Sequence, residues 1–301
     1  MTSTTRAVGW LLLTVPLARA AAAQELEPRA YSPSPVGTTF LVVSGTRSTG
    51  GVFTDPSLPI QDVEATVGVL GFGIGHAFGI ARKQVLLLAA LPVIRGQASG
   101  AVGEDRHSVT RKGLGDPRVK VSVILTGSPA MTRAEFARAP RRTIVGASMT
   151  VAPPLGKYDE TKLVNLGSNR WSFKPEVGVS HPAGRWTFDA YAGVWFFTEN
   201  DEFYPGASRR EQDPIAALQG HVSYTLGRRA WIALDGTFYS GGTTTIDGVD
   251  KADLQRNSRL GATLALPLGS RQSLKFAYSA GATTRVGADF STVAVAWQLV
   301  F

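Results

Sequence analysis

The sequence predicts an all-β protein, a transmembrane antiparallel up-and-down β-barrel of about 12 strands with short periplasmic turns and longer outer loops. Three observations lead to this prediction. Segments of about ten residues alternate between apolar and polar positions, and turn residues separate them. The chain ends on an aromatic residue. After the N-terminal region, no stretch offers the run of about 20 apolar residues that a spanning helix needs, so the chain would have to cross a membrane as strands.

The last predicted strand, Ala288–Phe301, has one apolar face. Counting back by twos from Phe301 gives Leu299, Trp297, Val295 and Val293, whereas the residues between them are mostly small or polar. Aromatic residues form girdles where lipid tails meet head groups. We therefore interpret Trp297, Leu299 and Phe301 as the assembly signal that the barrel-assembly machinery reads. An ordinary terminal strand that packs on a soluble core is the alternative.

Composition excludes several kinds of site. The chain has 301 residues, 44% of them hydrophobic, and contains no Cys, which rules out disulfides, zinc–thiolate sites and thiol chemistry. The formal charge of +8 is spread along the sequence without a long basic block. Such a pattern is typical of a solvated rim, so we expect no nucleic-acid partner.

The N-terminus carries the pattern of a secretory signal. Arg6 precedes an apolar stretch, residues 7–18, and Ala21 and Ala23 supply small residues at a cleavage site before Gln24. We therefore expect three parts: a signal peptide over residues 1–23, a periplasmic N-terminal tail over residues 24–35, and a transmembrane β-barrel over residues 36–301. The expected location is the outer membrane of a Gram-negative bacterium.

Twelve segments fit the alternating pattern to different degrees. They lie near residues 36–45, 62–75, 83–94, 115–126, 142–152, 168–180, 185–198, 214–226, 230–240, 254–266, 272–284 and 288–301. The third of these contains VLLLAALPVI, which is apolar at every position, so its facing is not assigned. Connections after even-numbered segments should be short turns and those after odd-numbered segments longer loops. The connection over residues 127–141 is long where the rule predicts a short turn. The connection over residues 285–287 is short where the rule predicts a longer loop.

Ten titratable residues fall on the face of the predicted strands that points into the barrel. A charge on the lipid face costs about 2–4 kcal/mol at mid-depth, so these side chains belong in the lumen. Either they line an open pore, or they pair with one another and fill a narrow barrel. The candidates are Asp116, Arg118, Lys120, Lys174, Glu176, Asp189, His221, Asp235, Arg259 and Lys275.

Catalytic, cofactor and metal motifs are not expected. His221 and Ser223 share a strand face, but residues two apart lie about 6–7 Å from each other, which exceeds a hydrogen bond. No G-x-S-x-G motif occurs, and no pair of His residues has metal-ligand spacing. Gly71, Gly73 and Gly75 share one face without the spacing of a nucleotide loop, and they indicate a bend or a close backbone approach.

Several stretches resemble a known family. They are GLGDPRVKVSVIL from Gly113, PPLGKYD from Pro153, LGSNRWSFKPEVGVSH from Leu166, FYSGGTTTIDG from Phe238, and the C-terminal stretch NSRLGATLALPLGSRQSLKFAYSAGATTRVGADFSTVAVAW. They are similar to the outer-membrane transporter family named for the putative MetA-pathway of phenol degradation.

The resemblance implies an outer-membrane channel for passive uptake of small hydrophobic or aromatic compounds. Its expected partners are outer-membrane lipid and a small apolar or aromatic solute. Two alternatives stay open. One is a structural or interaction barrel with a filled lumen, and the other is a membrane-embedded hydrolase. Family and fold alone do not fix which of these functions the chain performs.

Overall fold

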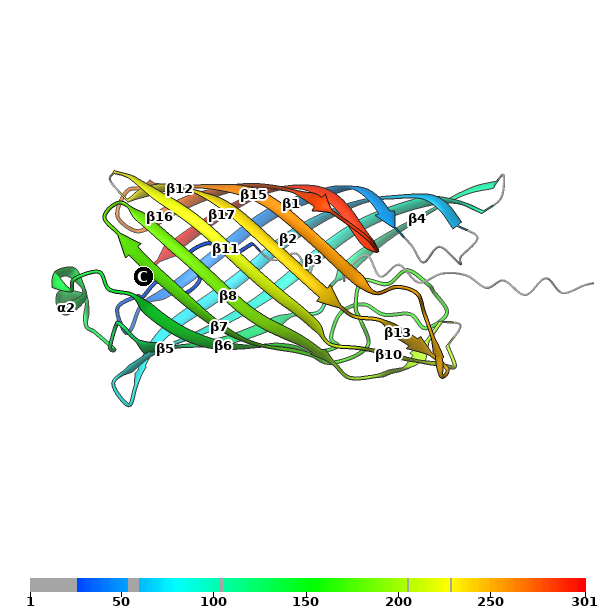
Figure 1. Ribbon diagram of the computed structural model, residues 1–301, viewed down its shortest axis with the longest axis horizontal. Helices are drawn as coiled ribbons and strands as arrows, with labels where there is room; N and C mark the ends of the chain where they lie inside the picture. Colours follow the sequence, from blue (N-terminus) through cyan, green and yellow to red (C-terminus); the bar gives the residue numbers. More distant parts are fainter. Residues whose placement is uncertain (1–25, 54–59, 103–104, 205, 228) are drawn as a thin grey trace, which may run out of the picture.

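The computed structural model describes residues 26–301, except 54–59, 103–104, 205 and 228. Twelve antiparallel strands form a closed barrel, because β1 pairs with both β2 and β17 (Figure 1). This confirms the predicted fold class. The wall consists of β1 (Thr39–Phe53), β2 (Ile60–Ile80), β3 (Lys83–Val102), β5 (Arg118–Thr126), β6 (Ile144–Ala152), β7 (Ser172–Ala183), β8 (Trp186–Phe197), β11 (Ile215–Gly227), β12 (Ala230–Gly241), β15 (Gln255–Leu268), β16 (Gln272–Thr283) and β17 (Gly287–Val300).

Each of the twelve predicted segments corresponds to one strand of the wall, but three strands are longer than expected. β1 continues to Phe53, β2 begins at Ile60 and β3 continues to Val102, where it pairs with β4 (Asp105–Leu114). The predicted loops over residues 46–61 and 95–114 were therefore wrong in large part. These extensions are rich in Gly, Ser and Thr and lack an apolar face, so the alternation that marks a lipid-facing strand is absent from them.

The two ends of the barrel differ. At the turn end, defined by the connections 81–82, 184–185 and 269–271, the chain reverses over a few residues. The long connection after β5 also lies there and contains α2 (Arg133–Arg138), which Thr132 and Glu135 cap. At the opposite loop end, β9 (Asn200–Phe203), β10 (Ser208–Gln212), β13 (Thr244–Ile246) and β14 (Val249–Asp250) form a separate small sheet.

The strand faces follow the expected alternation. Leu234 and Leu260 are 69% and 64% exposed on the outside, whereas the neighbouring Asp235 and Arg259 are 4% and 2% exposed. β3 has no such alternation because both of its faces meet apolar surroundings: Leu87 and Leu91 are exposed outside, and Leu88 lines an interior cavity.

The glycines of β2 allow a close approach, as their pattern predicted. A Cβ atom on Gly75 would lie 2.2 Å from the ring of Phe40, and one on Gly71 would lie 2.5 Å from Ser44 Oγ. Both Phe40 and Ser44 belong to β1 and line the same interior cavity. The missing side chains of β2 therefore make room inside the barrel for side chains of β1.

Tryptophan is not confined to the outside of the barrel. Trp171 and Trp186 are about half exposed, as an aromatic girdle requires. Trp195, however, is 4% exposed and packs in the interior with Ile215 and Tyr239. Its position on β8 gives it the inward facing, so it does not belong to an aromatic girdle at the membrane interface.

The predicted signal peptide, residues 1–23, lies outside the described residues, as does Gln24. None of the helices in the described part of the chain is both long enough and apolar enough to cross a membrane.

Candidate functional site in the barrel lumen

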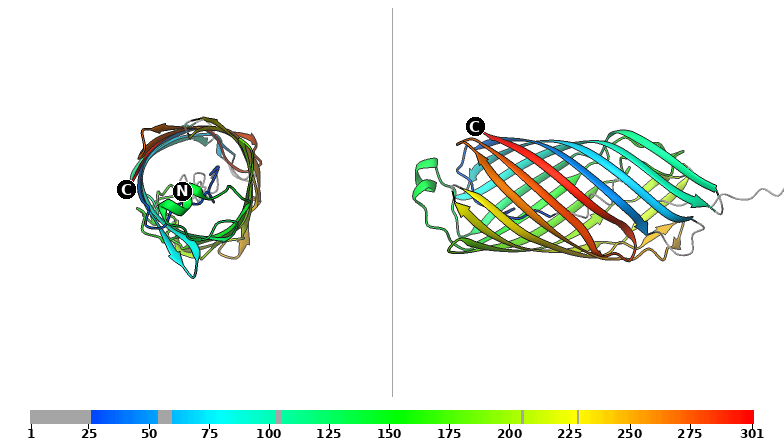
Figure 2. Two further views of the ribbon diagram at one scale, coloured as in Figure 1. Left: turned by 90° about the vertical axis from the view of Figure 1, so that its left-hand side faces the viewer. Right: turned by 90° about the horizontal axis from the view of Figure 1, so that it is seen from above.

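The segment before β1 lies inside the barrel. Residues 26–38, here called the N-terminal segment, run within the ring of strands (Figure 2). Two successive turns fold it, since the amide of Ala30 donates to the Glu27 carbonyl and that of Ser32 to the Arg29 carbonyl. The described part of the expected periplasmic tail, residues 26–35, therefore packs against lumen side chains rather than extending away from the barrel.

Tyr31 anchors the N-terminal segment. It is 1% exposed, and its hydroxyl donates to Glu176 Oε1 at 3.1 Å and lies 3.1 Å from Ser148 Oγ. The ring fits against two glycines that face each other on neighbouring strands: a Cβ atom on Gly146 or Gly178 would lie 2.2 or 2.3 Å from it. Two missing side chains thus create the slot that the ring fills.

Arg29 ties the segment to a further strand of the wall, β11. Its Nε donates to Ser223 Oγ at 2.9 Å and its Nη2 to Thr225 Oγ1 at 3.1 Å, both on β11. The guanidinium lies 4.7 Å from the centre of the Trp231 ring, a cation–π geometry. The backbone amide of Arg29 donates to Asp189 Oδ2 at 3.3 Å.

A network of charges links the segment to the wall. Lys174 Nζ lies 3.1 Å from Glu176 Oε2, and both side chains are 2% exposed. Lys120 Nζ lies 2.9 Å from Glu27 Oε2 and 3.7 Å from Glu176 Oε1. A buried charge without a partner costs several kcal/mol, so these groups depend on one another. Glu27, from the N-terminal segment, supplies one of the two carboxylates.

A second polar cluster surrounds His221. Its Nδ1 lies 2.7 Å from Asp235 Oδ1, and Asp235 Oδ2 accepts a bond from Thr263 at 2.7 Å. Ser223 is bonded to Arg29 instead, and no hydrogen bond between His221 and Ser223 is present in the described structure. In the same residues, no group of three or more potential metal ligands occurs. The geometry gives no support to a hydrolase.

All ten predicted lumen residues point into the barrel, but they divide into two sets. Six are no more than 4% exposed: Lys174, Glu176, Asp189, His221, Asp235 and Arg259. Lys120, with a side chain that is 13% exposed, joins their network. Asp116, Arg118 and Lys275 instead line a cavity in the lumen. The carboxylate of Asp116 also accepts the amides of Gly156 and Ser168, which holds the connection between β6 and β7 against the lumen.

The cavity has a volume of about 620 Å³ and extends from residues near the turn end, such as Phe40 and Lys275, to residues near the loop end, such as Trp195. The N-terminal segment borders it, since Glu27 is among the lining residues. Aromatic rings and apolar side chains make up much of the wall, and the charged residues lie among them. The inward aromatic lining residues are Phe40, Trp195, Phe197 and Tyr239.

Two buried arginines lie at the loop end of this cavity. Arg170 is 2% exposed, bonds Gln212 and stacks 4.1 Å from the ring centre of Phe197. Arg210 lies in the loop-end sheet, 5.2 Å from the ring centre of Phe203. Burial lowers the pKa of Arg210 to about 10, and the nearby carboxylate of Asp253 opposes that shift. Sequence reasoning missed Arg210 because it falls in a predicted loop, and it did not select Arg170, which lies near the start of the predicted segment 168–180.

Glu27, Arg29 and Tyr31 were missed as well, because a Pro-rich stretch before the first strand has no strand pattern. One signal for Tyr31 is present in the sequence. Gly146 and Gly178 both occupy inward positions of neighbouring predicted strands, and two facing glycines leave a space that some side chain must fill.

These features define an outer-membrane type of β-barrel whose lumen is packed in one part and hollow in another. Residues 44–298 match the family described as "Putative MetA-pathway of phenol degradation", and the chain belongs to that family. No curated protein matches it in sequence.

Solved structures share the fold. A COG4313 outer membrane channel from Pseudomonas putida F1 is 21% identical, with a TM-score of 0.78 over 92% of this chain and 100% of that one. The transport unit of the autotransporter AIDA-I from Escherichia coli is 8% identical, with a TM-score of 0.52 over 94% of this chain and 98% of that one. At such identities the likeness extends to the fold alone.

Proposed function

We propose that the protein is an outer-membrane channel for the passive uptake of small hydrophobic or aromatic compounds. The observation that carries this proposal is the cavity of about 620 Å³ with its aromatic lining. Sites for small molecules have typical volumes of about 300–1,000 Å³ and combine apolar walls with a few polar groups. The family description names phenol degradation, and a phenol has the ring and the single polar group that such a lining suits.

The proposed setting is the outer membrane, reached after cleavage of a signal peptide at residues 1–23 and insertion by the barrel-assembly machinery. The apolar outer face would contact outer-membrane lipid, and the turn end would face the periplasm. The N-terminal segment then closes the periplasmic half of the lumen. Passage of a solute through the lumen requires this segment to move, because its contacts with Gln84 of β3 and Ser223 of β11 reach from one side of the barrel to the other.

A structural barrel with a filled lumen is the second candidate. The buried pair of Lys174 and Glu176 and the anchored N-terminal segment favour it, because they pack part of the lumen. The two functions differ in whether the cavity takes up a solute and passes it on.

The test is equilibrium binding of 1-naphthol to the purified protein, together with its flux into proteoliposomes. Tyr239→Leu removes a buried ring from the cavity, and Phe238→Leu, on the outer face of the same strand, is the matched control. An aromatic pair contributes about 0.5–1.5 kcal/mol, so Tyr239→Leu should weaken binding roughly 2- to 10-fold while the control does not. Flux in the parent supports the channel. Absence of both binding and flux in the parent contradicts it and supports the filled barrel.

A further inference from the structure

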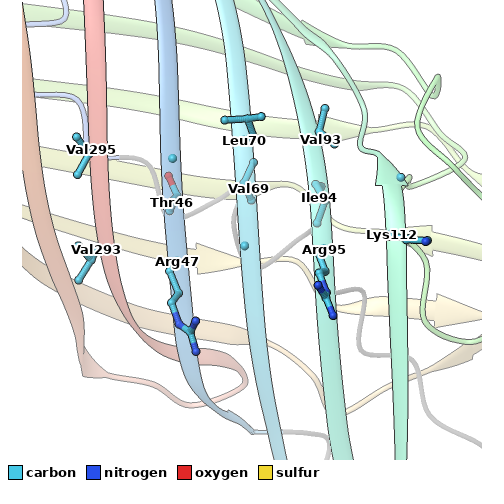
Figure 3. Close-up of a pocket in the computed structure, with 13 residues that line it drawn as sticks. Thr46, Arg47, Val69, Leu70, Val93, Ile94, Arg95, Lys112, Val293 and Val295 are labelled. Atoms are coloured by element: carbon cyan, nitrogen blue, oxygen red, sulfur yellow. The ribbon is translucent and has the colours of Figure 1, made fainter.

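The outer face of the barrel carries three cations on one level near the loop end. The strand register places Arg47 of β1 beside Gly68 of β2, Gly68 beside Arg95 of β3, and Arg95 beside Lys112 of β4. Figure 3 shows Arg47, Arg95 and Lys112 on these neighbouring strands. All three are exposed, and no ion pair or hydrogen bond to an acidic side chain is found for them in the described structure.

This cationic row lies at a sharp boundary. One level towards the turn end, the outward residues are apolar: Val295, Leu70, Val93 and Leu114, with Gly45 among them. One level towards the loop end, they carry hydroxyl or amide groups: Ser291, Thr49, Thr66, Gln97 and Thr110. The wall therefore changes from apolar to cationic to neutral polar over three successive levels.

The boundary coincides with the edge of the membrane core. On β2 the outward positions from Leu70 to Ile80 are apolar except His76, and the end residues are 46% and 58% exposed. A strand of ten residues rises about 33 Å, and a tilt of about 40–45° reduces this to roughly the 25 Å height of a lipid-facing band. The cationic row follows directly after this band, at the depth of lipid head groups.

The arrangement of the cations favours one shared anion. Arg95 and Lys112 are direct cross-strand partners, and like charges in that position repel each other. Arg47 lies two strands from Arg95, about 10 Å away at the usual strand spacing, and the Gly68 between them has no side chain. A phosphate group above Gly68 could meet both guanidinium groups, which bind phosphate in a bidentate manner.

A groove runs beside these cations on the apolar side. It has a volume of about 1120 Å³ and is lined by Gly45, Gly68, Leu70, Val93, Val293 and Val295, together with the cations themselves. Its floor includes two glycines, so the backbone of the wall is accessible there. An acyl chain fits such a groove, because it is apolar and lies within the lipid-facing band.

We infer that this face binds a phosphate-bearing membrane lipid of the leaflet at the loop end. The phosphate contacts Arg47, Arg95 and Lys112, neighbouring hydroxyls such as Thr49 and Thr66 bond the polar head group, and an acyl chain occupies the groove over Gly45. The site is on the outside of the barrel and is independent of the proposed transport function.

Binding of lipid A, a phosphorylated glycolipid, to the full-length protein in detergent tests the inference by native mass spectrometry. The variant Arg47→Gln/Arg95→Gln/Lys112→Gln removes the row. Its control, Arg138→Gln/Arg142→Gln/Arg271→Gln, removes the same charge from exposed positions at the turn end. Each cation near an anionic lipid contributes about 1 kcal/mol, roughly fivefold, so the first variant should bind about 100-fold more weakly. Heat-modifiable gel mobility verifies that both variants are folded.

Two further measurements separate the source of the phosphate. Removal of the phosphates from lipid A should weaken its binding to the parent protein. The loss should equal the loss that Arg47→Gln/Arg95→Gln/Lys112→Gln causes with phosphorylated lipid A. Gly45→Leu, which fills the groove on the apolar side without removing a charge, should weaken lipid binding severalfold and leave the affinity for inorganic phosphate unchanged. Equal lipid binding by parent and first variant overturns the inference. So does full displacement of the lipid by millimolar inorganic phosphate, which would indicate a site for free anions.

Discussion

The two halves of the lumen use the same alternating strands in opposite ways. In the half beside β6, β7 and β8, inward residues such as Lys174 and Glu176 are buried and paired, and the N-terminal segment packs among them. In the half beside β1, β2 and β3, Phe40 and Leu88 border a cavity of about 620 Å³. One half is therefore packed with polar groups, and the other is hollow and largely apolar.

This difference shows that inward facing does not decide whether a lumen is open. A twelve-stranded barrel is wider than the eight-stranded barrels that side chains can fill, so charged side chains alone do not close it. The closure requires an additional piece of chain, and Glu27, Arg29 and Tyr31 supply it. The comparison predicts that mutations in the packed half change stability and closure, whereas mutations at the barrel surface or terminus have smaller effects.

The largest effect should come from Glu176→Ala in the packed half. The change leaves Lys174 buried without its partner and also removes an acceptor of Tyr31, and breaking a buried pair costs about 3–5 kcal/mol. Urea unfolding in detergent, followed by the mobility of folded and unfolded bands, measures the loss. Glu199→Ala is the control, because that carboxylate pairs with Arg209 on the exposed surface and should contribute at most about 1 kcal/mol. Equal losses in the two variants would show that the packed half is not stabilised by its buried pairs.

A smaller effect on stability, with a clear effect on closure, should follow from Gly178→Ala. The added methyl group would overlap the ring of Tyr31, and overpacking of this kind costs about 1–3 kcal/mol. Because the ring belongs to the N-terminal segment, part of this cost can be relieved by displacement of the segment. We expect a higher conductance in planar bilayers than for the parent.

Gly220→Ala is the matched control for that experiment, since a Cβ atom at Gly220 meets nothing within 4 Å. We expect no change in conductance for Gly220→Ala. A Gly178→Ala protein that unfolds more easily but conducts like the parent would mean that Tyr31 does not hold the segment closed.

The smallest effect on the folded protein should come from deletion of Phe301. Its side chain is 51% exposed, and its backbone amide donates to the Thr39 carbonyl at 2.8 Å, so little of the fold depends on it. If Trp297, Leu299 and Phe301 form an assembly signal, the folded fraction in membranes should nevertheless fall severalfold. The heat-modifiable band in membrane fractions measures this fraction, and an unchanged yield would remove these residues from that role.

Strand alternation was sufficient to predict the wall and the inward facing of all ten charged or polar candidates. This prediction succeeds because the outward residues of each strand contact lipid and are therefore apolar, as Leu260 is beside the inward Arg259. It could not predict which inward residues pair, because partners such as Lys120 and Glu27 are 93 residues apart in the chain.

The central claim is that the N-terminal segment closes the lumen and must move for a solute to pass. Arg29→Cys/Ser223→Cys replaces one of its anchoring contacts with two thiols in a chain that has no other Cys. A short bifunctional methanethiosulfonate can then bridge the pair reversibly, and the two single-Cys variants control for the reagent. The measurement is 1-naphthol flux into proteoliposomes before bridging, after bridging and after reduction. We predict that bridging abolishes the flux and that reduction restores it, whereas a bridged protein that transports as fast as the reduced one would contradict the account.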